Sequence, residues 1–548
     1  MSPRIDFRHA AWCDAAAFEL ITLKKGDDPM NRICWKLCSA CAVLAVLALT
    51  ATADVKLPAV IGDNMVLQQK TKAPIWGTAD PGEEVAVTLG SQQATAKADA
   101  KGRWSVKIET PAAGGAVEVT VKGKNTITIK NVLIGEVWVC SGQSNMQWSV
   151  RASANPDKEI AGATYPKIRL FTVPRTPATE PQADCKGQWV ECSTQTIADF
   201  SAVAYFFGRD LNKTFDVPVG LINTSYGGTA AEAWTSRPTL ESVADFKPIF
   251  ERWDGMVANF PKAKEAFDKQ LAEWKIAAEK AKADGKDAPK QPAAPANPAT
   301  SPNHYSTLYN GMIAPIVPFA VKGAIWYQGE SNAGRAYQYR KLFPTMIQDW
   351  RKAWGQGDIP FLFVQLANYN PGHPEPEDGT TESDWAELRE AQSMTLSLAN
   401  TGQAVIIDVG DAKDIHPKNK QDVGHRLALA AQHVAYAKNL VYSGPVYDKV
   451  QVEASAARVK FKHVGGGLVA TGGPLKGFAV AGDDHKFFAA EARIDGDSVV
   501  VRCDQVEKPT AVRYAWANNP AANLFNKEGL PASPFRTDDW PGKTANAK

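Results

Sequence analysis

Apolar and polar residues alternate along residues 54–130. Apolar residues occupy every second position in short runs at 85–89, 104–106 and 117–121, and a glycine-containing turn precedes each run. Period-two spacing with frequent turns is typical of antiparallel strands that bury one face. We therefore expect residues 54–130 to form a small N-terminal β-sandwich-like domain.

The pattern changes over residues 131–440, where short β-branched runs alternate with longer stretches of helical periodicity. Strands and helices in alternation predict an α/β fold, with a parallel sheet covered by helices on both faces. Ligands bind such sheets beyond the carboxyl ends of the strands, so the residues after each strand are the candidates for chemistry. The expected strands are 137–140, 219–223, 324–328, 361–366 and 404–409, and the expected helices are 200–211, 337–354, 385–398 and 423–437.

An insertion interrupts this core at about 262–302. Phe267, Leu271 and Trp274 share one helical face among charged residues, and a Pro/Ala-rich connector follows them. This pattern favours a solvated helix and linker outside the site, and a lid over the pocket is the alternative. The alternating pattern then returns, which predicts a second β-domain over 441–548.

Residues 30–53 have the pattern of a signal peptide. A short basic region after Met30 is followed by an apolar run of 13 residues at 37–49 and by small residues at 51–53. The run is shorter than the ~20 residues that a membrane-spanning helix needs, so we expect no stable membrane span. Residues 1–29 then precede the true start, and the protein is expected to be secreted or periplasmic.

The charges nearly balance. Lys and Arg number 61 and Asp and Glu number 59, which gives a formal net charge of +2. Such a chain has no strong field to attract nucleic acid, and a small neutral substrate fits it better.

Four cysteines follow the signal segment. Cys185 and Cys192 either close a short disulfide loop or remain buried thiols, and Cys140 and Cys503 lie far from them in sequence. No CxxC or CxxH spacing occurs after the signal segment, so we expect no structural zinc site.

Ser144 is the strongest candidate for a nucleophile. A hydrophobic strand runs into Gly142, and the next turn presents Ser144 near backbone N–H groups, as a tetrahedral oxyanion requires. The second glycine of the α/β-hydrolase nucleophile elbow is replaced by Met146, which indicates a different hydrolase scaffold. A serine that only caps the next helix is the alternative interpretation.

His416 is the candidate general base because it follows the last core strand and therefore lies at the same edge of the sheet as Ser144. Asp414 stands two residues earlier, on the same side of an extended segment, where a carboxylate can orient the imidazole. Glu330, which follows another strand, is a competing partner for His416. His425 and His433 belong to the next helix and are interpreted as packing or surface residues.

Two further segments supply candidates for the oxyanion hole. Gln328 or Asn332 offers a side-chain amide after one strand, and the adjacent Gly227 and Gly228 allow close backbone approach after another. Four aromatic residues next to the motifs either stack on a sugar ring or pack in the core: Trp148, Trp234, Trp326 and Tyr327.

These segments, in this order, resemble the sialate O-acetylesterase family of the SGNH hydrolases. The most specific pieces are 142–146, 326–332 and 414–417, and 57–68 matches a motif in the leading β-domain. The resemblance implies an SGNH-hydrolase-like parallel sheet and no cofactor. It also implies that Ser144 attacks an acetyl carbonyl while His416 carries the proton.

The resemblance also implies that three groups form the oxyanion hole: the backbone N–H of Ser144, a glycine at 227 or 228, and a side-chain amide after the third strand. Many SGNH enzymes place the acid three residues before the histidine, where this chain has Lys413, so Asp414 and Glu330 both stay open as the orienting carboxylate. The expected function is a secreted serine esterase that removes O-acetyl groups from sialic acid. The alternatives are an esterase of acetylxylan or another polysaccharide, and a non-catalytic carbohydrate-binding protein.

Overall fold

The computed structural model describes residues 54–547. The predicted signal peptide at 30–53 lies outside the described residues. Between residues 54 and 547, every helix is too short or too polar to span a bilayer.

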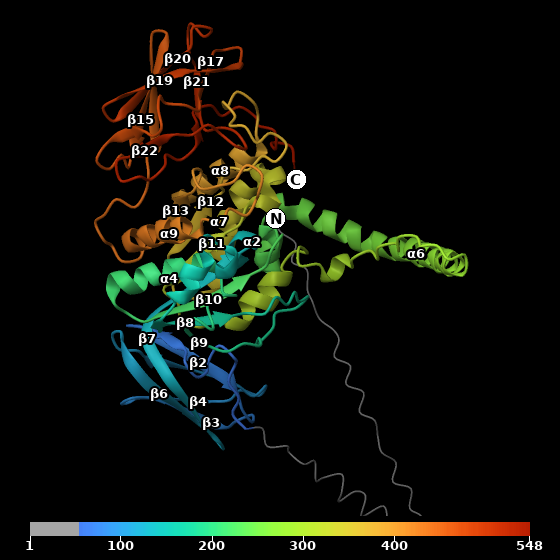
Figure 1. Ribbon diagram of the computed structural model, residues 1–548. Helices are drawn as coiled ribbons and strands as arrows, with labels where there is room; N and C mark the ends of the chain where they lie inside the picture. The colour runs from blue at the N-terminus through green and yellow to red at the C-terminus, as the bar shows by residue number, and fades with distance from the viewer. Residues whose placement is uncertain (1–53, 548) are drawn as a thin grey trace, which may run out of the picture. The chain divides into compact units, whose positions relative to one another are not determined.

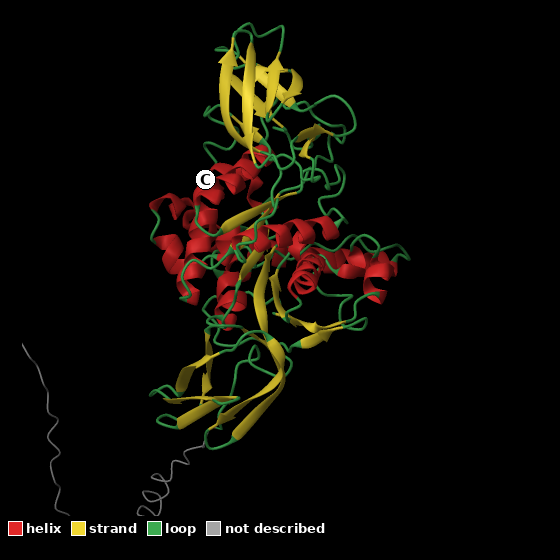
Figure 2. Ribbon diagram, turned by 90° about the vertical axis from the view of Figure 1, so that its left-hand side faces the viewer, coloured by secondary structure: helices red, strands yellow, loops and turns green. Residues whose placement is uncertain are grey.

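A twisted sheet forms the centre of the molecule (Figures 1 and 2). Its strands follow the order β13-β12-β11-β7-β10-β8-β9, and all neighbours are parallel except β8 and β9. The five strands expected from the sequence are present, although the one expected at 404–409 is β13 at Thr401–Val405, and the strands β8 and β9 were missed. The bounds are β7 Thr126–Gly142, β8 Tyr165–Thr172, β9 Val190–Cys192, β10 Val219–Ser225, β11 Gly323–Tyr327, β12 Phe361–Gln365 and β13 Thr401–Val405.

Helices cover both faces of this sheet. Trp138 of β7 packs edge-on against Phe207 of α4, at 5.0 Å between ring centroids, and α4 packs against α9. Trp326 of β11 lies on the opposite face and packs against Trp350 of α7, at 5.8 Å, and α7 packs against α8. The predicted α/β class is therefore confirmed. The helices are α4 Ala202–Phe215, α7 Ala336–Trp354, α8 Asp384–Met394 and α9 Lys420–Val434.

Strand β7 belongs to two regions at once. Its first half pairs antiparallel with β6 and its later residues pair parallel with β1, β10 and β11. Burial alternates at its start and becomes continuous from Val132, which is why the sequence pattern changes there although the strand does not end. The predicted boundary at 130/131 thus falls inside one strand. The preceding strands are β1 Val66–Gln68, β2 Lys72–Thr78, β3 Glu84–Leu89, β4 Gln92–Lys97, β5 Arg103–Glu109 and β6 Gly114–Lys122.

The C-terminal region contains two four-stranded antiparallel sheets, in the orders β14-β15-β20-β19 and β18-β17-β21-β23. Val459, Val480 and Tyr514 are fully buried in the core that these strands share. The predicted C-terminal β-sandwich-like region is confirmed. The main strands are β14 Val446–Glu453, β15 Ala456–Lys462, β17 Phe478–Ala481, β18 Phe487–Ala489, β19 Glu491–Asp495, β20 Ser498–Arg502, β21 Ala511–Tyr514 and β23 Phe535–Arg536.

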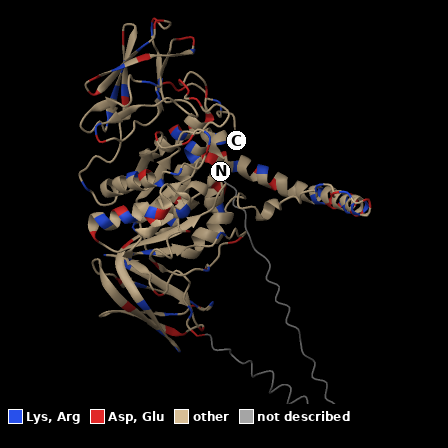
Figure 3. Ribbon diagram, in the orientation of Figure 1, with Lys and Arg blue, Asp and Glu red and all other residues tan. Residues whose placement is uncertain are grey.

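The insertion begins earlier than the sequence indicated. Helix α6 runs over Lys247–Ala283, and most of its residues are exposed. Basic residues, nearly all of them lysines, are interspersed with carboxylates along it (Figure 3). Its connector folds back so that Trp274 Nε1 donates to the Pro289 carbonyl at 2.7 Å. The predicted solvated helix is therefore present.

Cys185 and Cys192 are free thiols, so the disulfide alternative is wrong. Both thiols are packed against apolar groups, and this burial raises the pKa of each to about 12. Cys140 and Cys503 are also free.

Candidate active site

A tight turn places Ser144 at the carboxyl edge of the sheet. Gly142 ends β7 with a φ of +141°, and a Cβ there would lie 2.1 Å from the Tyr327 carbonyl oxygen of β11. Only glycine therefore lets the chain turn so close to the neighbouring strand. Ser144 is the first residue of the short helix α2 (Ser144–Gln147), and the N–H groups of a first helical turn have no acceptor within the helix.

His416 meets Ser144 across this edge. Its Nε2 lies 2.9 Å from Ser144 Oγ, and Trp148 stacks on the imidazole with 4.6 Å between ring centroids and 13° between planes. Partial burial lowers the pKa of His416, the charge of Lys420 lowers it further, and Asp414 opposes both. The imidazole is thus held in its neutral form, which can accept the serine proton.

The two candidate carboxylates occupy different places. Asp414 Oδ1 lies 3.6 Å from His416 Nδ1 and accepts the His416 backbone N–H at 2.9 Å. Glu330 instead directs Oε1 to the amide of Asn145, at 2.6 Å. Of the two, Asp414 is therefore the carboxylate that contacts the imidazole.

Gly227 is the glycine that lies beside the nucleophile. A Cβ at this position would lie 3.2 Å from Ser144 Cβ, and the Gly227 N–H donates to Gln147 Oε1 at 2.8 Å. The next glycine, Gly228, adopts a φ of +71°, and its carbonyl accepts from Asn303 outside the cavity that contains Ser144. Of the adjacent pair, Gly227 is thus the one that lines the cavity next to Ser144.

Neither Gln328 nor Asn332 is among the residues that line the cavity containing Ser144, which contradicts their assignment as amide donors. Both are buried, and Gln328 Nε2 donates to the Thr229 carbonyl and to Asn332 Oδ1. Asn332 Nδ2 donates to Glu232 at 3.0 Å. These amides complete a buried network that stabilises the loop after β11.

Comparison with known proteins decides the family. A family model described as "Carbohydrate esterase, sialic acid-specific acetylesterase" matches residues 297–433. The sialate O-acetylesterase of Homo sapiens is 30% identical over 545 residues, which cover 89% of this chain and 94% of that protein. The sialate O-acetylesterase of Mus musculus is 33% identical over 75% of this chain and 80% of that protein. The chain belongs to the sialate O-acetylesterase family.

A solved structure extends this result to the fold. The crystal structure of a carbohydrate acetylesterase from Xanthomonas citri is 39% identical, with a TM-score of 0.75, and covers 89% of this chain and all of that one. This member of the sialate O-acetylesterase family is therefore a carboxylic ester hydrolase built on the α/β scaffold described above.

The cavity that contains Ser144 and His416 has a volume of about 710 Å³. Asn223 and Arg175 line it. Neither was a predicted site residue, although Asn223 ends the strand expected at 219–223 and lies in β10 at the same sheet edge. The hydroxyl of Ser225 donates to Asn223 Oδ1 at 2.7 Å, which fixes the orientation of that amide. The other lining residues are Gln147, Trp148, Ser149, Ala152, Thr172, Val173, Pro174, Asp199, Ser225 and Gly227.

Only one of the four predicted aromatic platforms in this family member lines that cavity, namely Trp148. Trp234 and Trp326 are fully buried and pack against each other at 5.8 Å, and Tyr327 is 1% exposed. For these three residues the core-packing alternative holds, and their assignment to substrate binding is wrong. Trp326 and Tyr327 belong to β11, which is covered on both faces, and Trp234 at the end of Ala231–Trp234 packs against Trp326.

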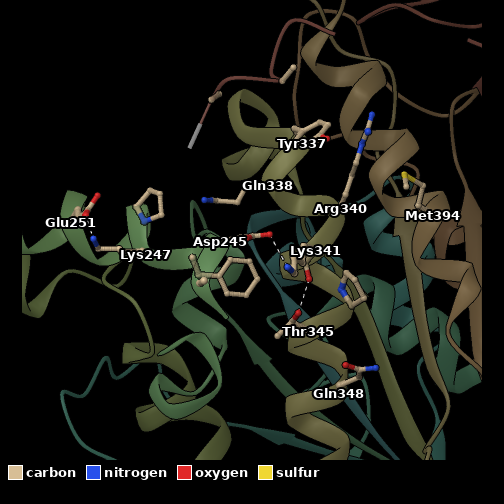
Figure 4. Close-up of a pocket in the computed structure, with 16 residues that line it drawn as sticks. Asp245, Lys247, Glu251, Tyr337, Gln338, Arg340, Lys341, Thr345, Gln348 and Met394 are labelled. Atoms are coloured by element: carbon tan, nitrogen blue, oxygen red, sulfur yellow. Dashed lines mark hydrogen bonds and ion pairs between the residues drawn. The ribbon is translucent and has the colours of Figure 1, made fainter. Parts of the chain in front are cut away.

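A larger cavity, of about 790 Å³, lies elsewhere (Figure 4). It is lined by the beginning of α6, by α7 and by the C-terminal tail, and it contains neither Ser144 nor His416. Its lysines are paired, Lys341 with Asp245 at 2.7 Å and Lys247 with Glu251 at 3.3 Å. It therefore offers no nucleophile and base of the kind that Ser144 and His416 form.

Proposed function

We propose that this chain removes O-acetyl groups from carbohydrate, and that O-acetylated sialic acid is its substrate. The 2.9 Å contact between His416 Nε2 and Ser144 Oγ carries the proposal, since it joins a nucleophile to its base in an open cavity. Membership of the sialate O-acetylesterase family supports the same chemistry.

The reaction proceeds by two acyl transfers. Ser144 Oγ attacks the acetyl carbonyl carbon while its proton passes to His416 Nε2. The sugar oxygen leaves with that proton, and the acetyl group remains on Ser144. Water then attacks the acyl-enzyme, gives a proton to His416, and releases acetate as Ser144 regains its proton.

Three N–H donors form hydrogen bonds to the negatively charged oxygen of each tetrahedral intermediate. They are the backbone N–H groups of Ser144 and Gly227 and the side-chain amide of Asn223, which takes the place predicted for Gln328 or Asn332. Gln147 accepts the Gly227 N–H in the free enzyme and must release it when substrate binds. Fixed donors of this kind stabilise a developing oxyanion more than they stabilise the substrate.

The position of Arg175 favours a substrate that carries a carboxylate. Its exposed guanidinium lines the cavity, whereas the nearby Asp199 pairs with Arg151 at 2.6 Å. A guanidinium binds carboxylate with two parallel hydrogen bonds, and sialic acid carries a carboxylate that acetylxylan lacks. Arg175→Gln is therefore expected to raise KM for O-acetylated sialic acid and to leave hydrolysis of p-nitrophenyl acetate unchanged.

Acetate release from O-acetylated sialic acid and from acetylxylan distinguishes a sialate esterase from a polysaccharide esterase. We expect kcat/KM to be higher for O-acetylated sialic acid than for acetylxylan in the wild-type enzyme. The reverse order, with no effect of Arg175→Gln, would assign the chain to acetylated polysaccharide.

Removal of the nucleophile tests the chemistry itself. Ser144→Ala is expected to lower turnover of p-nitrophenyl acetate by at least about a thousandfold. Ser149→Ala, which changes another serine of the same cavity, is the matched control and should keep nearly full activity. Equal activity of the Ser144→Ala variant and the wild type would refute Ser144 as the nucleophile. Absence of acetate release by the wild type itself would leave a non-catalytic carbohydrate-binding role.

We also propose that the protein is secreted or periplasmic, on the signal-peptide pattern of residues 30–53. Cell fractionation of the full chain and of a variant without residues 37–49 tests this location. Recovery of both proteins in the cytoplasm would overturn it.

A further inference from the structure

The side chain of Asn145 connects three segments that the chain brings together from distant positions. Its Nδ2 donates to Glu330 Oε1 at 2.6 Å and to the Ile415 carbonyl at 2.9 Å, and its Oδ1 accepts from Lys420 Nζ at 2.5 Å. Asn145 is 1% exposed, so no solvent replaces these partners. Every donor of its amide and one acceptor position are therefore occupied.

The positions of these partners relate directly to the reacting groups. Asn145 is the residue after Ser144, and Ile415 is the residue before His416. The hydrogen bond from Asn145 to the Ile415 carbonyl thus joins the nucleophile turn to the histidine loop. This bond lies beside the 2.9 Å contact between His416 Nε2 and Ser144 Oγ.

Lys420 and Glu330 fix which way the Asn145 amide faces. Lys420 is fully buried at the first residue of α9, and an ammonium group can only donate, so the oxygen of the amide must face it. The Ile415 carbonyl oxygen can only accept, so the amide nitrogen must face it and, with it, Glu330 Oε1. A flipped amide would place oxygen against carboxylate and nitrogen against ammonium.

We propose that Asn145 is a positioning residue for the reaction, and that Lys420 and Glu330 hold its amide in the orientation that keeps His416 against Ser144. The proposal rests on the proposed esterase function. The three side chains act on substrate only through Ser144 and His416, and none of them lines the cavity. Their effect is therefore expected in kcat rather than in KM.

Lys420 has a second effect, on the charge of His416. Its Nζ lies 5.9 Å from the centre of the Trp148 ring, which stacks on the imidazole, and 5.3 Å from that of Tyr327. Burial lowers the pKa of Lys420 to about 7, and its charge lowers the pKa of His416. Asp414 and Glu330 are the carboxylates that face this pair and oppose the shift in Lys420.

Substitution of Asn145 tests the first part. Asn145→Asp keeps the shape and an oxygen for Lys420 but removes both donors, and Asn145→Ala removes the whole contact. Each is expected to lower kcat for p-nitrophenyl acetate by about tenfold to a hundredfold with KM within about twofold, the loss typical of a displaced reacting group. Asn526→Ala is the matched control, because Asn526 is a fully buried amide of the C-terminal region with two backbone partners.

Substitution of Lys420 tests the coupling. Lys420→Met removes the donor and the charge with little change in length, and it is expected to lower kcat and to move the acid limb of the kcat/KM profile to higher pH. The double variant Asn145→Ala with Lys420→Met should be no more than about threefold worse than the poorer single variant, since residues that act as one unit are not additive.

Melting temperatures of all variants and the activity of Ser144→Ala are measured in parallel, so that loss of folding, loss of positioning and failure of the proposed function can be distinguished. A kcat within about twofold of wild type in both Asn145 variants overturns the proposal, as do additive losses in the double variant or equal losses in kcat for Asn526→Ala. An unchanged acid limb in Lys420→Met overturns the role of its charge. If Ser144→Ala is itself fully active, the proposed function fails and not merely this inference.

Discussion

Replacement of Asp414 by asparagine isolates the charge that faces His416. Asparagine keeps the oxygen that accepts the His416 backbone N–H, so the loop keeps its shape. The imidazolium formed during the reaction then loses the carboxylate 3.6 Å away. We expect kcat to fall because that imidazolium is less stable.

The size of the effect follows from the distance and the exposure. Two unit charges at this distance interact by about 1 kcal/mol in bulk water and by about 5 kcal/mol at the effective dielectric near a protein surface. The side chains of Asp414 and His416 are 47% and 27% exposed, which places the pair toward the weaker limit. A loss of about 1–2 kcal/mol corresponds to a decrease in kcat of about 5- to 30-fold.

Steady-state hydrolysis of p-nitrophenyl acetate measures this change. Asp411→Asn is the matched control, since Asp411 accepts the Lys413 N–H in the same loop at 2.8 Å and has the same kind of turn. The reasoning is refuted if Asp414→Asn stays within about twofold of wild type, or if Asp411→Asn loses as much activity.

Three further predictions concern the oxyanion, the acid limb and the core. Asn223→Ala should lower kcat by about a hundredfold with little change in melting temperature, and a normal kcat would remove Asn223 from the oxyanion hole. Because burial and Lys420 lower the pKa of His416 below its ordinary 6.5, kcat/KM should fall only as the pH drops through that lowered value, and a midpoint above 6.5 in a pH titration would contradict this. Trp326→Ala should destabilise the fold by about 3–5 kcal/mol in urea unfolding, whereas Trp148→Ala should change activity more than stability.

The meeting of Ser144 and His416 could be predicted because each follows a strand of the parallel sheet. Parallel strands end at one edge, so the order of the segments was enough to bring the two side chains together. The choice between Asp414 and Glu330 could not be made in the same way, since it depends on which way each side chain turns after its strand. Glu330 turns toward Asn145.

The oxyanion donors show the same limit. Gln328 directly follows β11 and Asn223 lies near the end of β10, so both are at the same edge of the sheet, but the contacts of Gln328 turn its amide into the core. The burial of Trp326 and Tyr327 was easier to predict from the sequence, because a central strand that is covered on both faces leaves no side chain free for a ligand. The break in pattern at Val132 was real, yet it marks a change in burial along one strand and not the end of that strand.

The 17-residue span of β7 has a consequence for how the enzyme can be shortened. A chain that starts at residue 131 would keep the serine and the histidine, but the parallel pairing of 133–135 with β1 would be gone and the backbone of β7 would have an open edge there. Open edges recruit other chains, so such a fragment is expected to aggregate during expression. The leading strands are thus a structural requirement of the hydrolase and not a removable appendage.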